Sequence, residues 1–197
     1  MKTLDEALQR LQELKSKGYI RTHRRGQTGI GKTLEDLLEI EENNIAIANT
    51  TFAEVKSARK GSQSMLTLFT KSPLPPKANT NLLDRFGYMT PLSKGGEILH
   101  TTVKATEYNM LKGEAGFKID VKKDKLCLVS TSGEEFGYWD ESTLKKSFEN
   151  KLHHVLYVLA DCRGEGKDEE FWFNEAWLLS GFDFEGFMNA VKSGVIC

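Results

Sequence analysis

The sequence has few cysteines and no long apolar run. Its three cysteines, Cys127, Cys162 and Cys197, form no C-x-x-C pair, so we expect reduced structural thiols and not disulfides or a zinc site. No apolar stretch approaches the ~18 residues that cross a bilayer. The N-terminal MKTLDEALQRLQELK is typical of an amphipathic helix and lacks the apolar region of a signal peptide. We therefore expect a cytoplasmic protein with no membrane partner.

The chain also lacks an excess of either charge, but its charges are unevenly distributed. The formal net charge is −1. Residues 14–34 carry six cations and no acid, and residues 55–83 carry five cations and no acid, while acids gather between them. A polyanion-binding surface around a metal centre has this pattern, because phosphates need cations and a hard cation needs carboxylates. Solvated helix faces would produce it too, so charge alone does not decide.

Hydrophobic periodicity predicts a mixed α/β domain, which fits a length of 197 residues and 39 % hydrophobic content. The most apolar predicted strand, HHVLYVLAD at 153–161, is expected to be central in the sheet. Residues 170–180 are predicted to extend a strand and then turn helical. Helices are predicted at 4–17, 34–42, 80–86, 142–150 and 183–193, and the other strands at 45–48, 51–58, 64–70, 97–104, 117–122 and 125–130.

The segment GQTGIGKT at 26–33 matches the phosphate-binding P-loop pattern G-x-x-x-x-G-K-[ST]. A P-loop needs a buried strand before it, whereas residues 19–25, YIRTHRR, are polar or charged after Ile20. An NTPase stays an alternative because 155–161 could supply its second motif, but we expect no nucleotide. The favoured interpretation is an anion-binding turn that leads into a helix capped by Thr33, where Gly29, Gly31 and Lys32 approach a DNA phosphate.

A second pattern is Glu54-Val55-Lys56 inside a predicted strand. Alternation places Glu54 and Lys56 on one face. In phosphodiester hydrolysis the carboxylate would hold Mg²⁺, and the amine would position or deprotonate water and offset negative charge. The pattern alone is weak, because an exposed ion pair on an edge strand has the same spacing. Two polar residues upstream, Glu35 and Asn49, complete the candidate set.

Four segments carry a resemblance to a known family. In chain order they are HRRGQTGIGKTLEDLLEIEENN, FAEVK, SMLTLFTKSPLPPKANTNLL with the following DRFGY, and ILHTTV with FKIDV. Together they cover most of residues 19–121. The chain resembles the MvaI–BcnI family of Type II restriction endonucleases, which belong to the PD-(D/E)-x-K nucleases and are related to the MutH nickase. The resemblance implies a restriction-endonuclease-like fold with a mixed central sheet flanked by helices.

The resemblance also implies roles for the candidate residues. Glu54 would be a metal ligand, the Val55 carbonyl would complete the metal's shell, and Lys56 would be the catalytic lysine. Glu35 would orient lysine, water or a second ion. The expected cofactor is Mg²⁺, with Mn²⁺ as a substitute, and the expected partner is double-stranded DNA. Backbone contacts are expected from Arg24, Arg25, Gly29, Gly31, Lys32, Thr33, Lys71 and Lys77.

The sequence departs from the family at two places. Asn49 stands where the family has a metal-binding aspartate, and a neutral carbonyl in place of a charge should lower Mg²⁺ affinity. An inactivated variant, a natural divergence and a shifted alignment with another acid would each explain it. Family members also continue past the helix at 183–193 into a segment that reads bases, whereas this chain stops at Cys197. Base recognition is then either built differently or shortened.

We therefore expect one nuclease domain over residues 1–197, acting as a monomer on a short GC-rich duplex site. Its catalytic lobe would span about 1–125 plus 150–163. A DNA-recognition lobe would span about 85–150 and 164–197. The alternatives are a DNA-binding form with impaired catalysis, a P-loop NTPase, and a MutH-like nickase guided by a partner.

Overall fold

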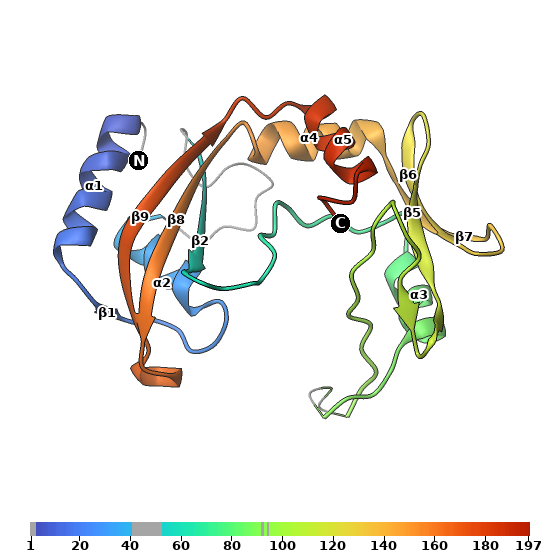
Figure 1. The fold of residues 1–197 in the computed structure, drawn as a ribbon, viewed down its shortest axis with the longest axis horizontal. Coiled ribbons are helices and arrows are strands. Elements are labelled where there is room, and N and C mark those ends of the chain that lie inside the picture. Colours follow the sequence, from blue (N-terminus) through green and yellow to red (C-terminus); the bar gives the residue numbers. More distant parts are fainter. Residues whose placement is uncertain (1–2, 41–52, 92, 94) are drawn as a thin grey trace. The chain divides into compact units, whose positions relative to one another are not determined.

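The structure is a computed structural model that describes residues 3–40, 53–91, 93 and 95–197 (Figure 1). The chain forms two compact units. Unit 1 contains Met1–Phe69 and Ser147–Phe182, and unit 2 contains Thr70–Lys146 and Asp183–Cys197. The chain passes from unit 2 to unit 1 within helix α4, Glu141–Lys151. The expected catalytic and recognition lobes stay a prediction, but their bounds differ from these units: residues 164–182, expected in the recognition lobe, fall in unit 1, where they form a hairpin with the strand before them.

Unit 1 is built on a four-stranded mixed sheet, as predicted. The strands are β1 (Ile20–Arg21), β2 (Glu54–Arg59), β8 (His154–Arg163) and β9 (Glu170–Ser180), in the order β1-β9-β8-β2. β2 runs parallel to β8, and the other neighbours are antiparallel. The strand predicted to be central, now β8, lies inside the sheet with a neighbour on each side.

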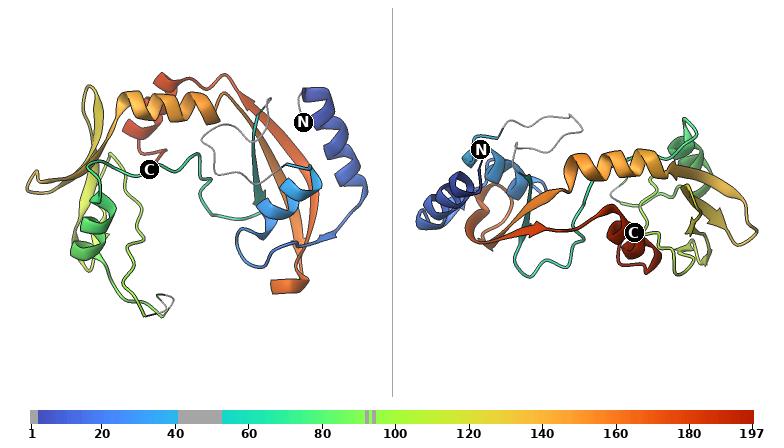
Figure 2. Two further views of the ribbon diagram at one scale, coloured as in Figure 1. Left: turned by 180° about the vertical axis from the view of Figure 1, so that it is seen from behind. Right: turned by 90° about the horizontal axis from the view of Figure 1, so that it is seen from above.

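Two helices cover one face of this sheet. α1, Leu4–Ser16, begins where the Thr3 side chain accepts a hydrogen bond from the Glu6 amide. α2, Gly29–Leu37, packs on β2 and is visible against the strands in Figure 2. Alternation sends one set of strand side chains toward the helices, and these form the core. The core contains Ala7, Leu11, Leu14, Ile30, Leu34, Leu38, Ile40, Ala53, Val55, Leu156, Val158, Ala160, Phe171 and Phe173.

Unit 2 contains a three-stranded antiparallel sheet in chain order. Its strands are β5 (Phe117–Val121), β6 (Lys125–Ser130) and β7 (Glu135–Asp140). The other elements are a small hairpin, β3 (Met110–Leu111) with β4 (Glu114–Ala115), and the helices α3 (Ala78–Phe86) and α5 (Phe184–Lys192). The rings of Phe86, Phe117 and Phe136 pack edge to face with centroids 5.0–6.0 Å apart.

An exposed carboxylate in unit 2 has two cationic partners. Glu135 forms ion pairs with Lys122 and Lys125. The hydrogen bond from Lys122, followed by that from Lys125, lowers the pKa of Glu135 to about 2. A carboxyl with a lowered pKa favours the folded state only while it is ionised, so this contribution is lost as pH falls.

Several predicted elements differ from the structure. Residues 64–70 and 97–104 form no strands; Ile98 makes only an isolated bridge with Tyr88. Residues 64–70 are exposed or half-buried, and apolar alternation builds a strand only where a partner supplies hydrogen bonds. Residues 170–180 are strand throughout and do not turn helical. The strand predicted at 45–48 lies outside the described residues. No helix in the described part of the chain is long and apolar enough to span a membrane.

Candidate active site

Glu54 and Lys56 lie side by side at the start of β2. Glu54 pairs with Val155 and Lys56 with Tyr157 of β8, so the parallel ladder fixes both positions. The Glu54 side chain is only 3 % exposed, and the Nζ of Lys56 lies 3.1 Å from its Oε1. The two side chains share a face, as alternation predicted. Although β2 is the last strand of the described sheet, the pair is not an exposed one, and a carboxylate this buried needs a cationic partner or a functional reason to be there.

A third residue, which the sequence did not indicate, reaches the same carboxylate. The Nζ of Lys151 lies 3.5 Å from Oε1 of Glu54. Lys151 is the last residue of α4, shortly before β8 begins. The only sequence signal for this contact would have been the pairing of β2 with β8, which brings the residues before Val155 toward Glu54.

Val55 and Glu35 lie where α2 meets β2. The Val55 side chain points to the opposite face from Glu54 and is buried in the core beneath α2. Gly31 of α2 faces β2, since a Cβ there would lie 3.8 Å from Ser57 Oγ. Glu35 follows four residues later, on the same side of the helix, and is half-buried. α2 and β2 are in direct contact, but α2 packs on the Val55 face of the strand and Glu54 and Lys56 lie on the other face. A position for Glu35 beside the strand pair therefore stays a prediction. The predicted fourth member, Asn49, lies outside the described residues.

The glycine segment is helical, which corrects two predictions. α2 begins at Gly29, not after Thr33, and Thr33 is no cap. Thr33 is fully buried, donates its hydroxyl to Gly29 O at 2.8 Å and accepts from the His23 amide at 2.9 Å. A Cβ at Gly29 would lie 2.2 Å from the Arg24 carbonyl oxygen, so glycine is needed there for close packing of the turn.

These features are not those of a P-loop. The strand before the segment, β1, is two residues long, is partly exposed, and lies antiparallel at one end of the described sheet. A P-loop needs a buried strand that delivers its loop to the helix. Arg24 and Arg25 lie exposed on the turn, while the predicted phosphate contacts of Gly29, Gly31 and Thr33 stay predictions.

Lys32 belongs to a charged network on the outer side of α2. Its Nζ lies 2.7 Å from one oxygen of Asp36, and His23 Nδ1 lies 2.9 Å from the other. The hydrogen bonds from Lys32, and then from His23, lower the pKa of Asp36. Asp36 therefore stays ionised at neutral pH and offsets part of the positive charge of this surface.

Arg59, at the end of β2, ties the glycine turn to the sheet. Its Nε and Nη2 donate to the two oxygens of Glu169 at 2.7 and 2.8 Å. Its guanidinium also donates to the carbonyls of Gln27 and Gly26 at 3.3 Å and lies 5.3 Å from the centroid of the Phe171 ring. The hydrogen bonds to Glu169 raise the pKa of Arg59. The ion pair is well shielded from solvent, since the side chains of Arg59 and Glu169 are 23 % and 13 % exposed.

Lys71 and Lys77 lie together in unit 2. Both line a hollow of about 500 Å³ formed by the segment before α3, and polar side chains line it too. Two lysines with hydroxyl and amide donors suit an anionic ligand such as a phosphate. The lining residues are Thr70, Lys71, Ser72, Pro73, Leu74, Pro76, Lys77, Ala78 and Asn79.

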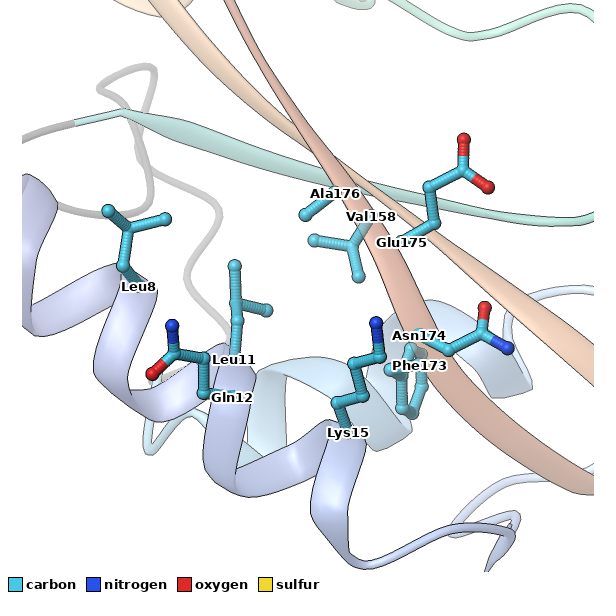
Figure 3. Close-up of a pocket in the computed structure, with 9 residues that line it drawn as sticks. All are labelled: Leu8, Leu11, Gln12, Lys15, Val158, Phe173, Asn174, Glu175 and Ala176. Atoms are coloured by element: carbon cyan, nitrogen blue, oxygen red, sulfur yellow. The ribbon is translucent and has the colours of Figure 1, made fainter.

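A second hollow does not belong to this site. It has a volume of about 180 Å³ and lies between α1 and the sheet of unit 1 (Figure 3). Leu8 and Leu11 of α1 and Val158 and Ala176 of the strands make much of its wall. Val158 belongs to the core face of the sheet, opposite to Glu54. This apolar hollow is therefore a packing feature of the helix-covered face.

Binding of the expected Mg²⁺ would depend on the ligand groups around Glu54. In the described ranges, no three His, Cys, Asp or Glu side chains cluster as they would at a metal site. Mg²⁺, however, keeps several waters and needs only one or two carboxylates from the protein. Glu54 offers a buried carboxylate that already attracts two ammonium groups. The residues present therefore fit a hydrated hard cation.

Comparisons with known proteins show the family of the chain. No curated protein matches the chain significantly. A solved structure of restriction endonuclease MvaI in complex with its cognate DNA substrate is similar, with a TM-score of 0.84 and 29 % identity, covering 98 % of this chain and 82 % of that chain. A structure of MvaI without DNA has a TM-score of 0.49 at 25 % identity, covering 98 % and 86 %. The profile of the MvaI/BcnI restriction endonuclease family matches residues 8–197. The α/β chain with its mixed sheet therefore has the restriction-endonuclease-like fold and belongs to the MvaI/BcnI restriction endonuclease family.

Proposed function

We propose that the protein is a Mg²⁺-dependent endonuclease that hydrolyses phosphodiester bonds in duplex DNA. The family is one of restriction endonucleases, and the similar MvaI structure contains cognate DNA. The observation that carries the proposal is the buried Glu54 carboxylate with the Lys56 amine 3.1 Å away on one strand face. A carboxylate and an amine at this spacing provide a metal ligand and a general base or charge-neutralising group together.

In this proposal Glu54, the Val55 carbonyl and Asn49 would hold the ion. Bound Mg²⁺ would polarise a phosphoryl oxygen and lower the pKa of a bound water. Lys56 positions the attacking water, accepts its proton at Nζ or offsets the negative charge that develops on the phosphorus oxygens. Glu35 orients Lys56 or the water from α2. The ladder with β8 keeps Glu54 and Lys56 at fixed positions, which limits the entropy lost in reaching the reactive geometry.

The two units would divide the work on DNA. Unit 1 carries the catalytic residues, and we assign recognition to unit 2. Arg24, Arg25 and Lys32 in unit 1 and Lys71 and Lys77 in unit 2 would contact phosphates, which position the duplex without reading its sequence. The substrate would be a short GC-rich site in double-stranded DNA. With one active site per chain, a monomer would cut one strand and then reorient for the second.

The test is cleavage of supercoiled plasmid with Mg²⁺ or Mn²⁺ and with EDTA. We expect nicked product before linear product, and no cleavage in EDTA. Lys56→Met and Glu54→Gln should each reduce the cleavage rate by at least about 10²-fold. Lys167→Met, which removes an exposed lysine from the turn between β8 and β9, should cleave as well as the natural sequence. Unchanged cleavage by both site variants would contradict the proposal.

A second candidate is a DNA-binding form with impaired catalysis. Asn49 favours it, because the resemblance places a metal-binding aspartate at that position. Asn49→Asp should then raise cleavage across a Mg²⁺ titration without changing DNA affinity in EDTA. If restoring the acid changes nothing at any Mg²⁺ concentration, Asn49 is not at the metal site.

A further inference from the structure

Among the described residues, two lysines contact the one carboxylate of Glu54. Lys56 and Lys151 place two ammonium groups at 3.1 and 3.5 Å from the same oxygen, Oε1 of Glu54. One ammonium is enough to balance one carboxylate, and the second also meets repulsion from the first. Both lysine side chains are largely shielded, 20 % and 23 % exposed, so water screens this repulsion only in part.

The two lysines are attached in different ways. Lys56 is on the same strand face as Glu54, two residues away, so it stays beside the carboxylate whatever else binds. Lys151 comes from a separate element, at the C-terminal end of α4. Leu152 donates its amide to Phe148 O at 2.7 Å, and both of these side chains are buried, which anchors the end of the helix. Lys151 could therefore leave Glu54 by rotation of its side chain alone, without movement of the helix end.

Lys151 also has a second favourable position close by. The last carbonyl groups of a helix are only partly hydrogen-bonded and carry partial negative charge, which stabilises a cation in the final turn. The Lys151 ammonium can return to these carbonyls at the end of α4 when it leaves Glu54. The ammonium can therefore exchange its contact with Glu54 for a contact with these carbonyl groups.

We propose that Lys151 occupies the cation position at Glu54 in the metal-free protein and competes with the divalent ion for that carboxylate. This inference rests on the proposed function, in which Glu54 is the metal ligand. Binding of the ion then requires the Lys151 side chain to move away, whereas Lys56 remains. Lys151 would raise the metal concentration that is needed to occupy the site. In the metal-free protein it would neutralise the buried Glu54 carboxylate.

The experiment measures Mn²⁺ binding to the DNA-free protein by electron paramagnetic resonance of the free ion. Lys151→Met removes the charge and keeps the length of the side chain, and we expect the protein to bind Mn²⁺ about five- to tenfold more tightly, equivalent to a partly shielded ion pair. Lys151→Arg keeps the charge and should bind as the natural sequence does. Lys60→Met is the matched control: it removes a lysine that pairs with Glu175 and is 31 % exposed, about 20 Å along the strand from Glu54, and it should leave the affinity unchanged. Circular dichroism spectra show whether each variant is folded.

Two results would overturn the inference. One is Lys151→Met binding Mn²⁺ no more tightly than the natural sequence, and the other is Lys151→Arg binding as tightly as Lys151→Met. The variant Glu54→Gln separates this failure from failure of the proposed function. If Glu54→Gln binds Mn²⁺ normally, Glu54 is no ligand and both ideas fail. If Glu54→Gln loses binding while Lys151→Met gains nothing, only the role of Lys151 is wrong.

Discussion

Replacing Arg59 by methionine should destabilise unit 1 by about 3 kcal/mol. The substitution removes the bidentate hydrogen bonds that Arg59 donates to the Glu169 carboxylate, which is 13 % exposed. Breaking a buried pair costs about 3–5 kcal/mol and breaking an exposed one under about 1 kcal/mol, so partial shielding predicts about 2–3 kcal/mol. Loss of the contact with the Phe171 ring, 5.3 Å from the guanidinium carbon, adds about 0.5–1 kcal/mol.

The assay is urea unfolding at pH 7 followed by tryptophan fluorescence. The chain has three tryptophans. Trp139 belongs to unit 2, while Trp172 and Trp177 belong to unit 1. In a Trp139→Phe background the remaining fluorescence therefore reports on unit 1. The double variant Arg59→Met with Glu169→Gln should lose less stability than the two single changes together, because the unpaired carboxylate is gone.

Unit 2 supplies a matched control for this reasoning. Arg85 makes a similar two-pronged contact with Glu134, at 2.5 and 2.9 Å, and lies 4.8 Å from the Phe136 ring centroid. Its side chain and that of Glu134 are 53 % and 47 % exposed. Arg85→Met should therefore cost far less, since water solvates the abandoned charge. Equal losses for the two arginine variants, or a loss under about 0.5 kcal/mol for Arg59→Met, would refute the argument from burial.

Three further outcomes are expected. Thr33→Val should cost about 1–2 kcal/mol in urea unfolding, because it removes a buried hydroxyl and leaves the part-buried His23 amide without its acceptor; a neutral change would mean that the turn readjusts. Asp36→Asn removes the negative charge 2.7 Å from Lys32. Binding of a short duplex at low salt, measured by fluorescence anisotropy, should therefore become about threefold tighter. Weaker binding would show that the network positions Lys32 for DNA. Glu135 should titrate by NMR with a midpoint of about 2, so that its contribution to stability is complete above the ordinary glutamate value and lost as pH falls toward 2; a midpoint at the ordinary value would show that its lysine pairs do not persist in solution.

Local patterns in the sequence predicted the shared face of Glu54 and Lys56 and many of the helices and strands. Alternation alone placed Glu54 and Lys56 on one face, and the apolar run at 153–161 was correctly predicted as an internal strand. Two predictions failed where tertiary packing overrides local pattern. Thr33 has the residue type of a helix cap, but the close approach allowed by Gly29 starts the helix a turn earlier and buries Thr33 inside it. The segments 64–70 and 97–104 have apolar residues but form no strand of the described sheets.

Contacts between distant segments were beyond sequence reasoning. The parallel pairing of Glu54 with Val155 depends on two strands that unit 2 separates along the chain. No local signal indicates which strand pairs with which, so the contact of Lys151 with Glu54 could not be derived from one sequence. The expected lobes differ from the compact units for the same reason, because only the β8–β9 hairpin joins residues 170–180 to the sheet that contains β2.

The discontinuity of unit 1 has a consequence for synthesis of the enzyme. On the ribosome, β2 is made about 100 residues before β8, the strand that holds Glu54 and Lys56 in register. At about 5–20 residues per second, the nascent chain waits roughly 5–20 s before this partner exists. During that interval the carboxylate and the amine are only neighbours on a growing polypeptide. The topology therefore delays assembly of the candidate active site until most of the protein has been translated.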